Sequence, residues 1–111
     1  MAQNKVKAIT RTSIAGSSLT SSYQAINNLG LDAACFQITL FNTTNGTIDV
    51  SYDGSTTNDI IPASGSLTIA AQTNNQPAAH VALFAKGQVV YVKGSSGTGS
   101  VYLSGYYVSY Q

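Results

Sequence analysis

The stretch Cys35-Phe36-Gln37-Ile38-Thr39-Leu40-Phe41 indicates the fold most directly. Phe36, Ile38 and Leu40 alternate with polar residues, so the three apolar side chains fall on one face of an extended chain. Alternation with a period of two is typical of a β-strand that buries one face. The stretch therefore predicts a half-buried strand, and its neighbours continue the pattern.

A second strand is predicted shortly after the first. Residues 47–52 alternate again, with Ile48, Val50 and Tyr52 on one face. Asn45-Gly46 precedes them, and both residue types tolerate the positive φ angles of a tight turn. The sequence therefore predicts a β-hairpin between these two strands.

Short strands separated by turn residues continue to the C-terminus. Further strands are predicted over residues 60–61, 66–70, 81–85, 89–93 and 101–110, with a short helix as the alternative for 81–85. Pro62 ends the first of these or confines it to a sheet edge, because proline cannot donate to a β-ladder. The glycine- and serine-rich segment 94–100 is predicted to be a flexible hairpin connection.

Regular turns between short strands, without a convincing helix, predict an all-β fold. The length of 111 residues suits a single domain. We expect an antiparallel β-sandwich, jelly-roll-like, or a small barrel, over residues 19–111. Residues 1–18 are expected to form an extended N-terminal arm, because this range carries Lys5, Lys7 and Arg11 but neither Asp nor Glu.

The composition argues against two classes of partner. Charged residues make up 8% of the chain, glutamate is absent and the formal net charge is +1. A chain-wide basic field for nucleic acid or an acidic lipid surface is therefore not expected.

No apolar run reaches the roughly 18 residues of a membrane helix. The N-terminus also lacks the apolar core of a secretory signal, so we expect synthesis and folding in a cytoplasm.

No catalytic residue is predicted. The chain has one cysteine, Cys35, which lies in an apolar run and is expected to be a small buried hydrophobe. A nucleophilic role would need a nearby base, and the only histidine, His80, is not placed near it by any sequence pattern. We therefore do not expect an enzyme. The weaker enzymatic alternative would depend on one of these two residues.

No metal or cofactor site is predicted either. Asp49, Asp53, Asn58 and Asp59 form an oxygen-rich set, but the spacing and closing glutamate of a calcium loop are missing, so a solvated turn is expected. The segment 94–100 resembles a phosphate loop only in its glycines. It is followed by a strand pattern and lacks the Lys-Ser/Thr pair that would open a helix.

Tyrosine is the one enriched residue type with functional potential. Adjacent Tyr106 and Tyr107 must point to opposite faces of the last strand, so one packs inward and the other is available for contact. Tyrosine is favoured both in cross-strand packing and at protein interfaces. Stacking on sugar rings is a further alternative, whereas the low charge argues against bases. Gly105 is expected to mark a bulge or a close backbone approach. Five tyrosines lie near the C-terminus: Tyr91, Tyr102, Tyr106, Tyr107 and Tyr110.

Three stretches together resemble a known class of protein. They are Ser17-Ser18-Leu19-Thr20-Ser21-Ser22-Tyr23-Gln24-Ala25-Ile26, Val50-Ser51-Tyr52-Asp53-Gly54 with Ile60-Ile61-Pro62-Ala63-Ser64-Gly65, and Val90-Tyr91-Val92-Lys93-Gly94-Ser95-Ser96-Gly97-Thr98-Gly99-Ser100-Val101-Tyr102-Leu103. As a set they are similar to small virion structural proteins of tailed bacteriophages, which are encoded among the head genes. The resemblance spans most of the chain after the arm.

The resemblance implies a non-enzymatic virion protein, with capsid decoration, or cement, as the expected role. It implies protein partners, namely the major capsid protein or other virion proteins, and a homo-oligomer, most often a trimer. Alternatives are a neck, tail or fibre (adhesin) component, and a small carbohydrate-binding module that uses the tyrosine face. No nucleic acid, membrane or cofactor is expected. The candidate interaction residues are Lys5, Lys7, Arg11, Tyr102, Tyr106 and Tyr110.

Overall fold

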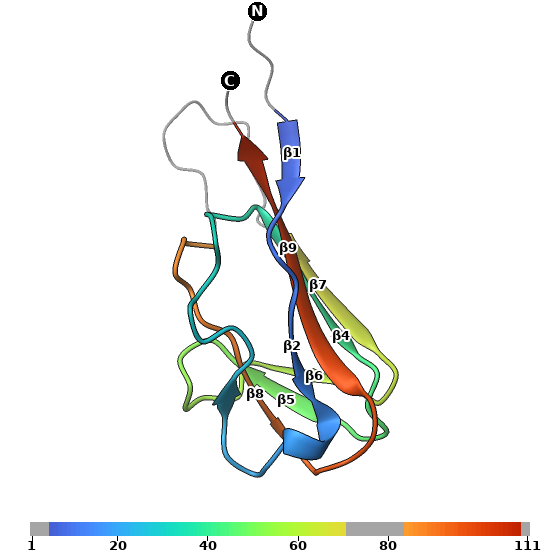
Figure 1. The fold of residues 1–111 in the computed structure, drawn as a ribbon. Helices are drawn as coiled ribbons and strands as arrows, with labels where there is room; N and C mark the ends of the chain where they lie inside the picture. The colour runs from blue at the N-terminus through green and yellow to red at the C-terminus, as the bar shows by residue number, and fades with distance from the viewer. Residues whose placement is uncertain (1–4, 71–83, 110–111) are drawn as a thin grey trace, which may run out of the picture.

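The computed structural model describes residues 5–70 and 84–109, which form β-strands and a single turn of 3₁₀-helix (Figure 1). The strands are short except for the last, as the frequent turn residues predict. The elements are β1 (Lys5–Ala8), β2 (Thr12–Ala15), η1 (Gly16–Ser18), β3 (Gln24–Ala25), β4 (Gln37–Asn42), β5 (Ile48–Ser51), β6 (Asp59–Ile61), β7 (Ser66–Ala70), β8 (Tyr91–Gly94) and β9 (Ser100–Ser109).

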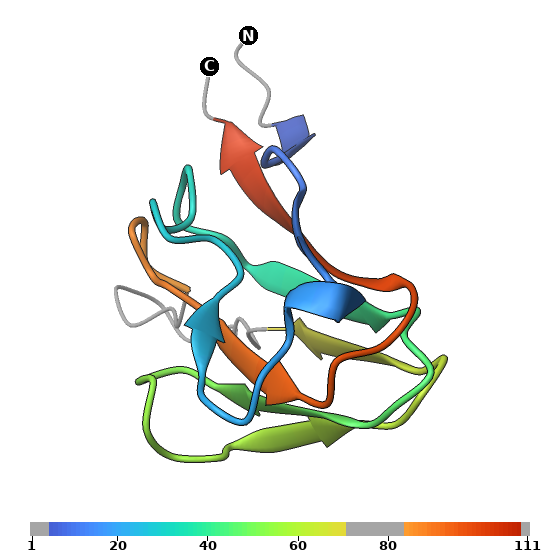
Figure 2. The ribbon, with the colours of Figure 1, turned by 60° about the horizontal axis from the view of Figure 1, so that its bottom comes forward.

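The strands form two antiparallel sheets that pack face to face (Figures 1 and 2). In sheet A the order is β1-β9-β4-β7, and β2 pairs with β9 on the same side as β1. In sheet B the order is β3-β8-β5-β6. This arrangement confirms the predicted all-β sandwich. The short strand that precedes Pro62, β6, lies at an edge of sheet B, as predicted.

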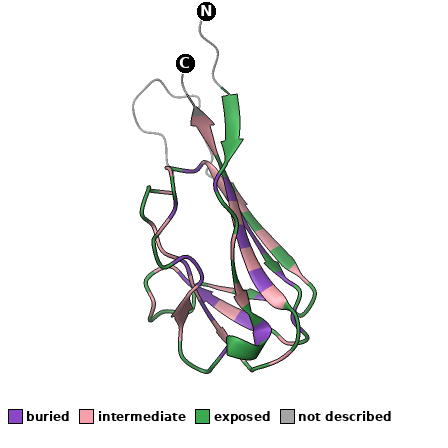
Figure 3. Cartoon of the chain, viewed as in Figure 1, coloured by how far each residue is buried: buried purple, intermediate pink, exposed green. Residues whose placement is uncertain are grey.

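The core lies between the two sheets and is built from the apolar positions of the alternating strands. Ile38 and Leu40 of β4 face Val50 and Val92 of sheet B, and all four side chains are fully buried. Figure 3 shows the buried positions as bands that recur along the strands. Each such side chain contributes roughly 1.5–3 kcal/mol when it leaves water, so the alternation first seen at residues 35–41 dominates the stability.

The predicted hairpin between residues 35–41 and 47–52 is wrong. β4 belongs to sheet A and β5 to sheet B, so the connection crosses the sandwich instead of turning back within one sheet. Asn42 fixes this crossing, because its buried side-chain amide donates to the carbonyls of Gly46, Ile61 and Pro62 at 2.9–3.1 Å. Its Oδ1 accepts the backbone N–H of Thr44 at 3.0 Å.

The predicted hairpin over residues 94–100 is likewise a crossover. β8 pairs within sheet B and β9 within sheet A. The backbone of Gly16 holds the segment in place, because its N–H donates to Gly99 O at 2.8 Å and its carbonyl accepts the N–H of Gly97 at 3.0 Å. Gly99 has a φ of +77°, which explains the glycine there.

The described part of the range 1–18 pairs with the domain. β1 and β2 both lie antiparallel along β9, which is long enough to hold them one after the other. The division into an arm and a domain at residue 18 stays a prediction. Gly105 of β9 confirms the predicted close approach, because a Cβ there would lie 3.2 Å from Cys35 Sγ and from Ile9 Cδ1.

The predicted strand over 81–85 lies mostly outside the described residues. Phe84, which is described, forms a single β-bridge with Cys35, and the two residues exchange backbone hydrogen bonds at 2.8 Å.

Candidate interaction surface

The outward face of sheet A is a broad surface with a single charged side chain among the described residues. Residues directly opposite each other on neighbouring strands share a face. The pairings Phe41↔Tyr102, Thr39↔Ser104 and Thr39↔Thr68 therefore place these side chains together on the side away from the core. We define the sheet A patch as Arg11, Ser13, Thr39, Phe41, Thr68, Tyr102, Ser104 and Tyr106.

Aromatic residues mark one end of the patch. Phe41 is 43% exposed and lies beside Tyr102. The guanidinium carbon of Arg11 lies 4.9 Å from the centroid of the Tyr102 ring. This cation–π contact orients both side chains at the surface. An aromatic pair with a stacked arginine has the composition of an interface centre.

The middle of the patch is small and polar. The hydroxyls of Thr39 and Thr68 lie 3.2 Å apart across β4 and β7, and Ser104 follows on β9. Such short side chains do not project far from the sheet. Thr39 is buried, so the hydroxyls of Thr68 and Ser104 are the ones that can donate and accept hydrogen bonds to another protein.

Tyr106 forms the other end. It is 37% exposed and lies between Gln37 of β4 and Ala8 of β1. Tyr107 points the other way and packs against the core cluster. The two tyrosines therefore lie on opposite faces, as predicted.

The outward face of sheet B differs in charge. Asp49 and Lys93 lie opposite each other on β5 and β8. The loop after β5 covers part of this face, because Gly54 lies against the ring of Tyr91. Ile60 of β6 is 62% exposed but stands beside Asp49. Of the two faces, sheet A is the one with apolar and uncharged polar groups over several neighbouring strands.

The predicted interaction residues separate into groups. Arg11, Tyr102 and Tyr106 come together in the sheet A patch. Lys5 and Lys7 stand on β1 opposite Ser109 and Tyr107, so they belong to the other face of the strand pair. Tyr110 lies outside the described residues. The binding role of all six stays a prediction.

Two exposed apolar residues beside or within this region were not identified from the sequence. Ile38 and Leu40 occupy even positions of the strand and face the core. Phe41 occupies an odd position, so its side chain points to the polar face. The presence of an aromatic residue on an otherwise polar face could have identified Phe41 as a surface contact residue. Val6 is 65% exposed on β1, and its signal was weaker because the surrounding segment has no clear period.

Cys35 is buried, as predicted. Its side chain is fully buried and its Sγ donates to the carbonyl of Ala33 at 3.4 Å. Burial raises the pKa of the Cys35 thiol, and the nearby Asp32 carboxylate raises it further. A raised pKa keeps the sulfur as the weakly nucleophilic thiol at neutral pH. His80, the only histidine, lies outside the described residues.

Of the oxygen-rich set, Asp53 and Asn58 lie in the turn between β5 and β6, Asp59 begins β6, and Asp49 lies within β5 opposite Lys93. The carboxylate of Asp53 accepts the backbone N–H groups of Ser55 and Thr56 at 2.9 and 2.8 Å, and these bonds lower the pKa of Asp53. Asp59 accepts the hydroxyl of Tyr52 at 2.7 Å. The pKa of Tyr52 is raised mainly by burial of the side chain, and the hydrogen bond to Asp59 raises it further. Within residues 5–70 and 84–109 no three metal-ligating side chains cluster.

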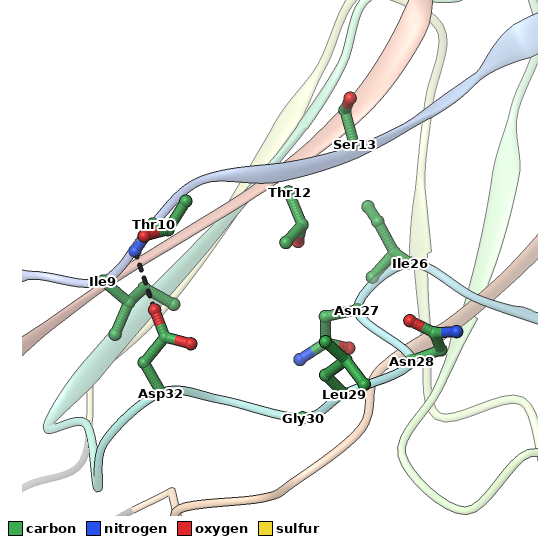
Figure 4. A pocket seen from close by; sticks show the side chains of 10 residues that line it. All are labelled: Ile9, Thr10, Thr12, Ser13, Ile26, Asn27, Asn28, Leu29, Gly30 and Asp32. Carbon is green, nitrogen blue, oxygen red and sulfur yellow. Dashed lines mark hydrogen bonds between the residues drawn. The ribbon is translucent and has the colours of Figure 1, made fainter.

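A cleft of about 460 Å³ lies between β2 and residues 26–32 (Figure 4). Ile9 and Ile26 contribute apolar walls, and Leu29 stands exposed at its rim. The one charged group that lines it, Asp32, already accepts the backbone N–H of Thr10 at 3.1 Å. One carboxylate oxygen of Asp32 is therefore engaged within the fold. No helix over the described residues is long and apolar enough to cross a membrane.

Comparison with known proteins supports the fold alone. No protein family matches the chain, and no curated protein does. Among solved structures, a subunit of the Bacillus endospore appendages, described as disulfide-linked pili, aligns at a TM-score of 0.50 and 11% identity over 95% of this chain and 89% of that one. The Dit protein of phage SPP1, a hub of its adsorption apparatus, aligns at 0.41 and 12% identity over 96% of this chain and 57% of that one.

Proposed function

We propose that this chain is a non-enzymatic structural subunit of a bacteriophage particle, and that it decorates the shell by docking through the sheet A patch. The observation that carries the proposal is the patch itself, a sheet face with exposed aromatic residues and one arginine. The sequence resemblance to small phage virion proteins is the reason for proposing a phage particle as the binding partner.

The chemistry of the patch suits protein contact. Interfaces are enriched in tyrosine, phenylalanine and arginine at their centre, and depleted in lysine and acidic residues. Phe41, Tyr102 and Arg11 provide such a centre, with Arg11 held over the tyrosine ring before any partner arrives. An oriented side chain loses less conformational entropy on binding, which favours affinity.

A non-enzymatic role is supported by the state of the one thiol. Cys35 is buried behind Gly105 and its pKa is raised, so it is poorly suited to attack a substrate. Asp53 and Asp59 are engaged in local hydrogen bonds. These side chains stabilise the fold and are not poised for proton transfer.

Substitution of Phe41 tests the proposal. Phe41→Ser is expected to weaken binding to particles stripped of this chain by about 30-fold, which is the effect of losing one central aromatic anchor. Binding is measured by co-sedimentation across a concentration series, with circular dichroism to confirm that the variant folds. Ile60→Ser is the matched control, because Ile60 is at least as exposed but lies on sheet B.

The control separates docking from general loss of apolar surface. Retained binding by Ile60→Ser together with loss by Phe41→Ser supports the patch as the docking face. Equal affinity of both variants for the particles would show that the sheet A patch is not the docking face. A greater loss of affinity in Ile60→Ser would place the contact on sheet B.

A further inference from the structure

The end of sheet A is a two-stranded ribbon that projects past the sandwich (Figure 1). β1 pairs with the last residues of β9, from Tyr106 to Ser109, whereas β4 pairs with β9 only as far as Tyr106. All four residues of β1 are exposed. A two-stranded ribbon is marginally stable in water by itself and gains stability from a third strand or a covering surface.

The two faces of this ribbon differ in chemistry. Lys5 and Lys7 lie on one face, and Val6 lies on the other beside Val108. Within residues 5–70 and 84–109, no strand pairs with the outer edge of β1. That edge therefore presents backbone groups flanked by alternating positive and apolar side chains.

Pairing of this edge with the same edge of a second copy is unfavourable. Antiparallel pairing of two β1 strands would bring lysines close to lysines on one face, and like charges directly opposite destabilise a sheet. Lysines on an edge strand protect proteins against such self-association. The edge therefore accepts only a strand that brings compensating charge.

The chain has no acidic strand of its own to offer. It contains four acidic residues. Asp32 accepts the N–H of Thr10, and Asp49 stands opposite Lys93 within sheet B. Asp53 caps its own turn and Asp59 accepts the Tyr52 hydroxyl. An acidic strand that complements Lys5 and Lys7 would therefore come from a different protein.

We propose that the outer edge of β1 receives an extended segment of a partner protein, in which acidic residues alternate with apolar ones. The backbone of this segment adds a strand to sheet A, its acidic side chains lie beside Lys5 and Lys7, and its apolar side chains lie beside Val6. Addition of a strand to an exposed edge is a general mode of peptide recognition. The inference deepens the proposed function, since it names the chemistry of a second contact to the particle.

Synthetic peptides test this contact without particles. The probe is a seven-residue peptide of alternating glutamate and valine, and its control has the same composition in two blocks. The full chain is expected to bind the alternating peptide at least tenfold more tightly than the block peptide, as measured by fluorescence anisotropy at low salt. Hydrogen exchange at residues 5–8 should slow when the alternating peptide is added.

Charge reversal identifies the residues. K5E/K7E is expected to lose about tenfold or more in affinity for the acidic peptide and to bind an alternating lysine–valine peptide instead. K86E is the control, because Lys86 is exposed in a turn of the described chain outside β1 and β9. It should leave the affinity unchanged.

Two results overturn this inference. One is no detectable binding of the alternating peptide up to millimolar concentration, which would leave the lysines with the single role of protecting the edge. The other is equal binding by the wild-type chain and K5E/K7E. Neither result touches the sheet A patch, whose own test is the comparison of Phe41→Ser with Ile60→Ser, so failures of the two proposals are distinguishable.

Discussion

Replacement of Asn42 by leucine is expected to lower the free energy of unfolding by about 3 kcal/mol. Leucine has a similar size but cannot form hydrogen bonds. The side chain of Asn42 is 1% exposed, and it donates to three carbonyls and accepts one backbone N–H where the chain crosses between the sheets. Removal of the Asn42 amide leaves these backbone groups without a hydrogen-bond partner in a buried site.

The measurement is equilibrium unfolding in urea, followed by tyrosine fluorescence and circular dichroism. The unfolding slope should stay constant if only stability changes. Asn28→Leu is the matched control, because Asn28 is exposed and has no side-chain hydrogen bond among the described residues. It should shift stability by less than about 0.5 kcal/mol. A loss below about 1 kcal/mol for Asn42→Leu would show that the crossing does not depend on this amide.

Gly30→Ala is expected to have an effect of similar size, about 3 kcal/mol, for a different reason. Gly30 has a φ of +83°, where an L-residue is strained. A Cβ there would also overlap the carbonyl and Cα of Gly87, which are backbone atoms and cannot rotate away. Leu31 N–H donates to Gln88 O at 3.0 Å beside this contact, so the two segments cannot separate without losing that bond.

Gly87→Ala separates the cost of backbone strain from the cost of steric overlap. Gly87 has a φ of +90°, but a Cβ there would meet no atom within 4 Å, so only the backbone strain of about 1–2 kcal/mol is expected. The difference between the two alanine variants, measured by urea unfolding, gives the cost of the steric overlap. Equal losses for both variants would mean that the Gly30–Gly87 contact relaxes freely.

Strands β4 to β9 could be predicted from the sequence because alternation is a local signal, whereas no strand is predicted over residues 1–26, where β1, β2 and β3 lie. Ile38 and Leu40 specify a buried face of β4 whatever strands lie beside it. The assignment of strands to sheets depends on distant contacts. The Asn45-Gly46 dipeptide suits a hairpin, but the hydrogen bonds of Asn42 to Ile61 and Pro62 hold β4 and β5 in different sheets. Nothing within residues 42–47 reveals those partners.

The candidate surface could be predicted in part for the same reason. Tyr102 and Tyr106 share a face of β9 because they are four residues apart on a strand, and this is visible in the sequence. The position of Arg11 over Tyr102 requires the pairing of β2 with β9, which joins residues about ninety positions apart. Local composition instead grouped Arg11 with Lys5 and Lys7. The structure places these lysines on the other face of the ribbon.

The proposed role places many copies of this chain on the shell of a phage particle. Its most direct test is the copy number of this chain relative to the major shell protein in purified particles from the source, measured by quantitative mass spectrometry. Decoration of the shell predicts copies comparable to those of the shell protein. A few copies per particle would assign the chain to the neck, tail or a fibre, and complete absence from particles would contradict a virion role.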